Sequence, residues 1–149
     1  MRVEYINPFV ETAFSVLSEV LGGEVRRGDL YLKSTSMPVM GVAALVGLAG
    51  DVEGRVLFDM SLETALNIAS TMNMERLDTF DDLAKATITE LANLVTAQAV
   101  TKLHELGFKF DLTPIGPMAD LHKMARVGAN GVKLLLSDST NALSEGFSK

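Results

Sequence analysis

The fold is decided by residues 78–114, DTFDDLAKATITELANLVTAQAVTKLHELGFKFDLTP, which combine a long amphipathic helix with a following strand. At about 100° per residue, one stripe of the helix is apolar and is expected to pack into the core. The members of this stripe are Ile88, Leu91, Val95, Ala99, Leu103 and Leu106. Asp78 or Thr79 is the expected N-cap, and Gly107 is the expected end of the helix.

Glu90 and Asn93 point away from the predicted core stripe, one helical turn apart. Ala86 and Ala97 lie one turn before and one turn after this pair, so no bulky side chain shields the carboxylate or the amide. Two apolar residues are also expected outside the buried stripe, Leu94 and Val100. Apolar groups beside a polar pair on an outer face indicate a contact surface for another macromolecule.

On spacing alone, a Glu and an Asn three residues apart are typical of a solvated helix face. Their chemistry is also limited, because an amide cannot act as a general base and can only donate or accept hydrogen bonds. Asn93 could therefore orient a water molecule. A pair without a nucleophile or a metal requires a substrate that brings both.

The run ATITELANLVTAQAVTKLHELGFKFDLTP, residues 86–114, resembles the signature helix of the CheC/CheX/FliY family of chemotaxis phosphatases. The family pattern is Asp or Ser, then Glu, then Asn, then a distant Pro. Glu90, Asn93 and Pro114 match it, whereas Ala86 stands where the family has Asp or Ser. The resemblance extends upstream through GLAGDVEGRVLFDMSLETALNIAS, and a single site of this kind is similar to the CheX branch.

The resemblance implies a CheC-like α+β (α/β layered) fold, an antiparallel β-sheet with helices packed on one side. It also implies a phosphatase that hydrolyses the aspartyl phosphate of a CheY-like response regulator. Asn93 would hold the attacking water and Glu90 would engage a lysine of the receiver domain. The receiver would supply Mg²⁺, so no cofactor or metal is expected on this chain. The alternative is a non-catalytic receiver-binding module, a chemotaxis adaptor or a flagellar-switch component.

The composition predicts one domain over residues 1–149, with 48% hydrophobic and 21% charged residues. The apolar excess favours a homodimer, which sheet extension between subunits would provide. A net charge of −6 argues against sequence-independent binding to nucleic acid. The absence of cysteine excludes disulfides and thiol chemistry. His104 and His122 have no further ligand pattern around them and do not indicate a metal site.

The amino terminus, MRVEYINPF, lacks the apolar segment of a secretory signal. The most hydrophobic stretch, residues 34–50, is interrupted by proline and glycines and is shorter than the ~20 apolar residues of a membrane-spanning helix. We therefore expect a cytoplasmic protein without a membrane segment.

Local patterns predict the first half of the chain. A helix should begin at the Asn7-Pro8 pair and end at the Gly22-Gly23 pair. An edge strand is expected around residues 30–32. Residues 39–48 and 55–60 should pair as a hairpin.

The same reasoning covers the rest of the chain. Ser61 should cap a short helix that continues to about Met72. Beyond the long helix, strands are expected at residues 108–112, 124–127 and 132–136, and a loop at 114–117. The final dozen residues are rich in Ser and Asn and are expected to be peripheral.

An internal repeat follows from this order of elements. Helix, strand, loop, strand and strand occur in residues 8–60 and again in 80–137, which describes two tandem α-β-X-β-β repeats. The two helices also end in similar phrases, LSEVLG and LHELG. Glu11 occupies the place of Glu90 in the first copy, but Phe14 occupies the place of Asn93. The sequence therefore predicts one site and a catalytically silent Glu11.

Overall fold

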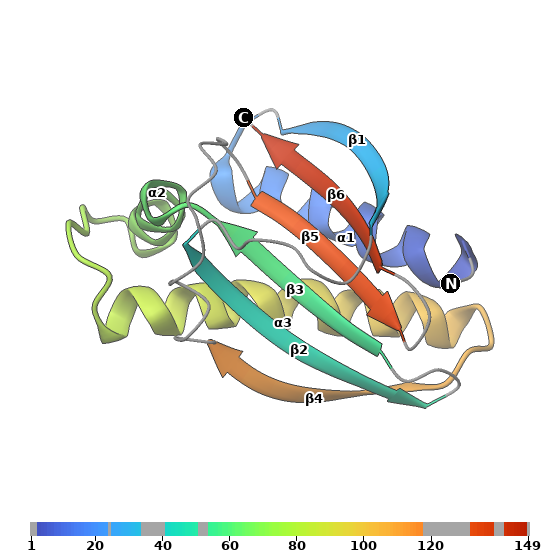
Figure 1. Cartoon of the computed structure of the whole chain (residues 1–149). Helices are drawn as coiled ribbons and strands as arrows, with labels where there is room; N and C mark the ends of the chain where they lie inside the picture. The colour runs from blue at the N-terminus through green and yellow to red at the C-terminus, as the bar shows by residue number, and fades with distance from the viewer. Residues whose placement is uncertain are drawn as a thin grey trace.

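The computed structural model describes residues 3–23, 25–33, 41–50, 54–117, 132–138 and 142–148. Within these residues, the chain forms α1 (Val3–Leu21), β1 (Arg26–Lys33), β2 (Val42–Gly50), β3 (Gly54–Met60), α2 (Leu62–Asn73), α3 (Asp82–Glu105), β4 (Phe110–Pro117), β5 (Val132–Asp138) and β6 (Ala142–Ser148). The described strands make one six-stranded sheet in the order β1-β6-β5-β3-β2-β4. Every pairing in it is antiparallel (Figure 1).

The helices cover one face of this sheet. Figure 1 shows α1 and α3 running behind the strands and α2 at one end of them. Alternate residues of the expected β2–β3 hairpin face the helices and are buried, because successive side chains of a strand point to opposite faces. These cross-strand pairs are Val42 with Met60, Ala44 with Phe58 and Val46 with Val56. The predicted layered α+β arrangement is therefore confirmed.

Helix α3 packs its predicted apolar stripe into this core. Five members of the stripe are buried, namely Ile88, Leu91, Val95, Ala99 and Leu103. The expected N-cap at Asp78 or Thr79 is wrong, because Asp81 is the cap and its carboxylate accepts a hydrogen bond from the Ala84 amide at 2.9 Å. Leu106 is also wrong as a core residue. It follows the last helical residue and is 60% exposed, before Gly107 turns the chain at φ 92°.

Helix α1 begins earlier than the Asn7-Pro8 pair predicted. The expected start before Pro8 is wrong, since α1 begins at Val3 and contains Pro8. Tyr5 in this extra turn lies edge-on against Phe108 and Phe110, with ring centroids 4.8 and 5.4 Å apart. Aromatic contacts of this kind stabilise the added turn. A proline so close to a helix N-terminus removes only one intrahelical hydrogen bond.

The carboxyl-terminal half departs from expectation in two places. Residues 114–117 are not a loop, because β4 continues through Pro117. Its position at the edge of the sheet explains this, since an edge strand tolerates a missing amide hydrogen. The final residues are not peripheral either, because β6 lies between β1 and β5. Backbone pairing on both sides holds β6 despite its polar composition. The strand expected at 124–127 lies outside the described residues.

The two tandem repeats are visible in the order α1-β1-X-β2-β3 and α3-β4-X-β5-β6, with α2 between them. The last strand of the second copy is β6, so this copy extends beyond residue 137. In the sheet, β1 lies beside β6 of the second copy, and β4 lies beside β2 of the first. Each copy therefore completes the sheet of the other, and the two share one core.

Candidate functional site

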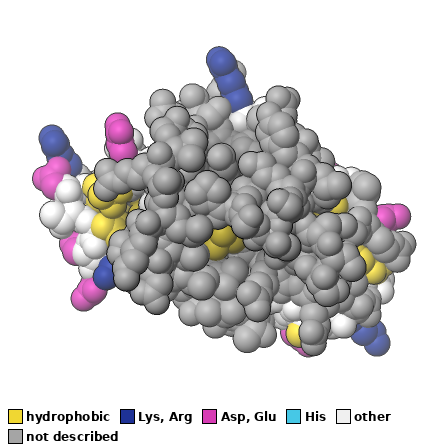
Figure 2. Space-filling view, viewed as in Figure 1, with side chains coloured by type: hydrophobic (Ala, Val, Ile, Leu, Met, Phe, Trp, Pro, Cys, Tyr) yellow, Lys and Arg dark blue, Asp and Glu magenta, His cyan; other side chains and the backbone are white. Residues whose placement is uncertain are grey.

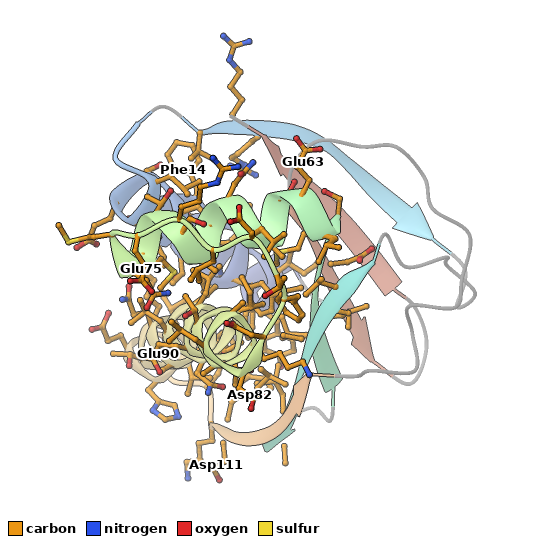
Figure 3. All side chains as sticks on the ribbon, turned by 90° about the vertical axis from the view of Figure 1, so that its left-hand side faces the viewer. Phe14, Glu63, Glu75, Asp82, Glu90 and Asp111 are labelled. Carbon is orange, nitrogen blue, oxygen red and sulfur yellow. The ribbon has the colours of Figure 1, made fainter. Side chains whose placement is uncertain are left out.

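The outer face of α3 carries a stripe of side chains directed away from the sheet. Its members recur at intervals of three and four residues, which places them on one side of a helix. They are Leu83, Ala86, Glu90, Asn93 and Ala97, of which Asn93 is half-buried and the others are exposed. Figure 3 shows Glu90 on the side of the molecule turned away from the sheet. The predicted outward orientation of Glu90 and Asn93 is confirmed.

The functional groups of both residues are available for another molecule. Within the described residues, no hydrogen bond or ion pair engages the Glu90 carboxylate or the Asn93 side-chain amide. The backbone carbonyl of Asn93 accepts a hydrogen bond from Thr96 Oγ1 at 3.2 Å, which leaves the amide side chain unaffected. A buried threonine thus supports the helix beneath the pair.

The small residues beside the pair are placed as the sequence indicated. Ala86 and Ala97 are both exposed, so a partner can approach Glu90 and Asn93 without meeting a large side chain at the neighbouring stripe positions. Leu94 is half-buried and packs against the core cluster. The expectation for Val100 is wrong, because this residue is buried in the core cluster.

A hydrogen-bonded clamp joins α2 to the first turns of α3. Asn73 Nδ2 donates to Thr87 Oγ1 and to the Ala69 carbonyl, both at 2.8 Å. Thr87 Oγ1 donates in turn to the Leu83 carbonyl at 2.8 Å. Thr87 lies one turn before Glu90 and is only 8% exposed. Sequence reasoning missed this clamp, since no local pattern pairs an asparagine with a threonine of the next helix.

The segment between α2 and α3 is tied back to α2 as well. Ser70 Oγ accepts a hydrogen bond from the Leu77 amide at 2.9 Å and lies 3.5 Å from the Leu77 carbonyl, to which it donates. Arg76 and Asp78 form an exposed ion pair at 2.8 Å. These contacts hold residues 76–78 outside α3, and the Asp81 cap sets where the helix begins.

The corresponding position of the first repeat is occupied differently. Glu11 Oε2 lies 3.6 Å from Lys102 Nζ, so this carboxylate forms an ion pair between α1 and α3. Phe14 is 38% exposed and presents a ring where the second copy presents the amide of Asn93. Figure 3 shows Phe14 on α1. This copy lacks the side-chain combination of the candidate site.

Other predicted features lie apart from the pair. Pro114 lies in β4, where its backbone is in register with Val46, so it belongs to the sheet rather than to the helix face. His104 Nε2 lies 2.9 Å from the Phe110 carbonyl and links the end of α3 to β4.

Among the described residues, no group of three or more His, Cys, Asp or Glu side chains is arranged to hold a metal ion. Within the same ranges, no helix is long and apolar enough to cross a membrane.

Comparison with known proteins identifies the family of the chain. Residues 42–124 match the family described as Chemotaxis phosphatase CheX. The CheY-P phosphatase CheX of Thermotoga maritima is 30% identical over 116 residues, which cover 76% of this chain and 74% of that protein. The chain belongs to the CheX family of chemotaxis phosphatases. The resemblance inferred from Glu90, Asn93 and Pro114 is thereby confirmed at the level of the family, as is the CheC-like fold.

Two further relatives differ in how much they share with the chain. The CheX–CheY–BeF₃–Mg²⁺ complex from Borrelia burgdorferi matches with 37% identity and a TM-score of 0.71, covering 99% of this chain and 98% of the solved one. Ribonuclease J 1 of Streptococcus pyogenes serotype M3 is 34% identical over 113 residues, 74% of this chain but 20% of that protein. Because that match covers a fifth of the ribonuclease, we do not assign its activity to this chain.

Proposed function

We propose that this chain hydrolyses the aspartyl phosphate of a CheY-like receiver domain, with Asn93 positioning the attacking water and Glu90 pairing with a receiver lysine. The observation that carries the proposal is the outer stripe of α3, where both side chains are accessible and without partners among the described residues. Membership in the CheX family supports it.

The chemistry available to the pair suits this substrate. An amide neither ionises near neutral pH nor attacks phosphorus, but it can hold a water molecule by accepting and donating hydrogen bonds. Phosphoryl transfer depends largely on positioning and on stabilisation of charge. A receiver that carries its own phosphoryl group, Mg²⁺ and lysine would need little more than Asn93 and Glu90 from its partner. In the Borrelia burgdorferi complex, BeF₃ stands in for the phosphoryl group and is accompanied by Mg²⁺.

The shape of the stripe favours insertion into a recessed phosphorylation site. Ala86 and Ala97 keep the helix narrow on either side of the pair. Ala86 also means that the carboxylate or hydroxyl expected there from the family pattern is missing. Among the members of the outer stripe, Glu90 is therefore the one acidic side chain, and it alone would pair with the receiver lysine.

The test measures binding and turnover separately for each residue. Asn93→Ala should abolish most phosphate release from a phosphorylated receiver while leaving affinity for the BeF₃-loaded receiver nearly unchanged, because it removes an interaction made in the transition state. Glu90→Ala should weaken binding by about 2–5 kcal/mol, since it leaves a lysine unpaired in the interface. Affinity and turnover should then fall together.

Matched controls are available on the same helix. Gln98→Ala removes an exposed amide outside the stripe, and Glu105→Ala removes an exposed carboxylate at the last helical residue. Neither should change binding or turnover. Equal and small effects of Asn93→Ala and Glu90→Ala on phosphate release would refute the assignment.

The alternative function is receiver binding without turnover. The observation that favours it is Ala86, which removes a polar group from the family pattern. A panel of phosphorylated receivers with substoichiometric wild-type protein distinguishes the two functions. Accelerated phosphate loss supports catalysis, whereas tight binding without acceleration identifies a binding module.

A further inference from the structure

Two large apolar side chains border the site at the amino-terminal end of α3. Leu83 is 43% exposed and lies one turn before Ala86 on the same outer stripe as Glu90. Met74 is 92% exposed and caps the carboxyl end of α2. The clamp brings Met74 close to this stripe, because the preceding residue, Asn73, bonds to Thr87 of α3.

The backbone at Met74 is unusual for so large a side chain. Its φ of 56° and ψ of 30° place it in the left-handed region, where glycine or asparagine is the usual helix cap. The backbone amide bonds to the carbonyls of Ser70 and Thr71, so the position is fixed by α2. Folding gains little from a side chain that remains 92% exposed. A methionine at this position is therefore explained better by contact with another molecule.

The surroundings of this apolar pair are acidic. Glu75, Asp81 and Asp82 are exposed beside it, and the charge of Asp78 is partly offset by its ion pair with Arg76. In Figure 2, apolar side chains at the α2 end of the molecule are surrounded by acidic side chains and a few basic ones. Such a border complements a partner with lysine or arginine around an apolar contact.

The apolar pair lies within reach of a receiver docked on the candidate site. Leu83 precedes Glu90 by seven residues, which is about 10 Å along a helix. A standard interface covers about 800 Å² per partner, a disc of about 16 Å radius. Figure 3 shows Glu75, the neighbour of Met74, and Glu90 on the same side of the molecule, away from the sheet. A receiver centred on Glu90 and Asn93 would cover Leu83 and extend toward the carboxyl end of α2, which carries Met74.

We propose that Leu83 and Met74 form an apolar docking patch that contacts the receiver beside its phosphorylation site. The patch selects receivers that present an apolar surface bordered by lysine or arginine. This inference rests on the proposed function, since it assigns to the same receiver a second contact. The patch makes the same contact before and during hydrolysis, so it contributes to affinity and not to the chemical step.

The experiment compares Leu83→Gln and Met74→Asn with the wild type. Asparagine is tolerated in the left-handed conformation, so Met74→Asn removes the apolar side chain without straining the cap. Each variant should raise KM for the phosphorylated receiver about tenfold, in line with the loss of a largely buried apolar side chain. The turnover number kcat should stay within about twofold of wild type, since uniform binding is lost.

Leu62→Gln is the matched control. Leu62 is 43% exposed, like Leu83, and also lies in the first turn of a helix. It belongs to the opposite end of α2 from Met74, and Figure 3 shows its neighbour Glu63 far from Glu75. This substitution should leave KM unchanged.

Two outcomes would overturn the proposed patch. They are an unchanged KM in Leu83→Gln and Met74→Asn, and an equal rise in KM in Leu62→Gln. If KM is unchanged and light scattering shows that self-association is lost, the two residues instead form a contact between copies of this chain. Wild-type protein that releases no phosphate would instead refute the proposed function. The patch is then tested by affinity for the BeF₃-loaded receiver, which should fall about tenfold in both variants.

Discussion

The clamp between α2 and α3 allows a quantitative prediction about what holds the site helix in place. Thr87→Val keeps the shape of the side chain but removes the hydroxyl that accepts from Asn73 Nδ2 and donates to the Leu83 carbonyl, both at 2.8 Å. Asn73→Ala removes the donor of the first bond and a second bond to the Ala69 carbonyl. The two substitutions therefore share one hydrogen bond.

The magnitude follows from the bonds that are lost. A neutral intramolecular hydrogen bond contributes about 1 kcal/mol, so each single substitution should lower the free energy of unfolding by about 1–2 kcal/mol. Thr87 is 8% exposed, and water does not readily replace its partner. Because the shared bond can be lost only once, the double variant should be less destabilised than the sum of the singles by about 1 kcal/mol.

The assay is a double-mutant cycle measured by urea unfolding. Thr89→Val is the control partner for Asn73→Ala. Its hydroxyl bonds to the Lys85 carbonyl at 2.9 Å and has no partner on α2 among the described residues. That control cycle should be additive within about 0.3–0.5 kcal/mol. A Thr87–Asn73 coupling no larger than the control would show that the clamp does not join the helices energetically.

Four further expectations follow from single features. Glu11→Ala should leave phosphate release intact and reduce the free energy of unfolding by at most about 1 kcal/mol, since its ion pair with Lys102 is exposed; a large loss of activity in the folded variant would contradict the single site. Gly50→Ala should lower the free energy of unfolding by about 3 kcal/mol or more, which a fall in the melting temperature would report. The reason is that φ at Gly50 is 143° and a Cβ there would lie 2.1 Å from the Lys109 carbonyl oxygen. Thr12→Val should stabilise the protein by about 1 kcal/mol in urea unfolding, since Thr12 Oγ1 is buried without a hydrogen-bond partner in the described structure. The chain should form a homodimer in light scattering, through edge strand β1 or β4; a monomer at high micromolar concentration would refute this.

The parts of the fold that depend on local chemistry could be predicted from the sequence. Ser61 caps α2 by accepting from the Thr64 amide at 3.1 Å, as a serine before an apolar run indicates. The β2–β3 hairpin follows from two apolar runs around a glycine-rich connection. Prediction failed where distant contacts decide the outcome. Tyr5 extends α1 past Pro8 by packing on aromatic residues more than a hundred positions away.

In the candidate site as well, the features that follow from a local sequence pattern could be predicted and the others could not. Helical periodicity alone places Glu90 and Asn93 on the outer face, because the opposite stripe is apolar. Val100 was misplaced because periodicity does not locate the border of the buried face. The left-handed cap at Met74 could not be predicted, since its residue type disfavours that conformation.

The two repeats show why the number of sites does not follow from the fold. The strands of the two copies are interleaved in one sheet, so the inner faces of α1 and α3 are constrained by a common core. The outer faces have no such constraint, and substitutions there change stability by little. In α3 this freedom leaves Glu90 and Asn93 accessible, whereas in α1 it allows Phe14 in place of the amide and an ion pair at Glu11. A duplicated scaffold can therefore keep both halves of its core while only one outer face carries the Glu and Asn side chains of the proposed site.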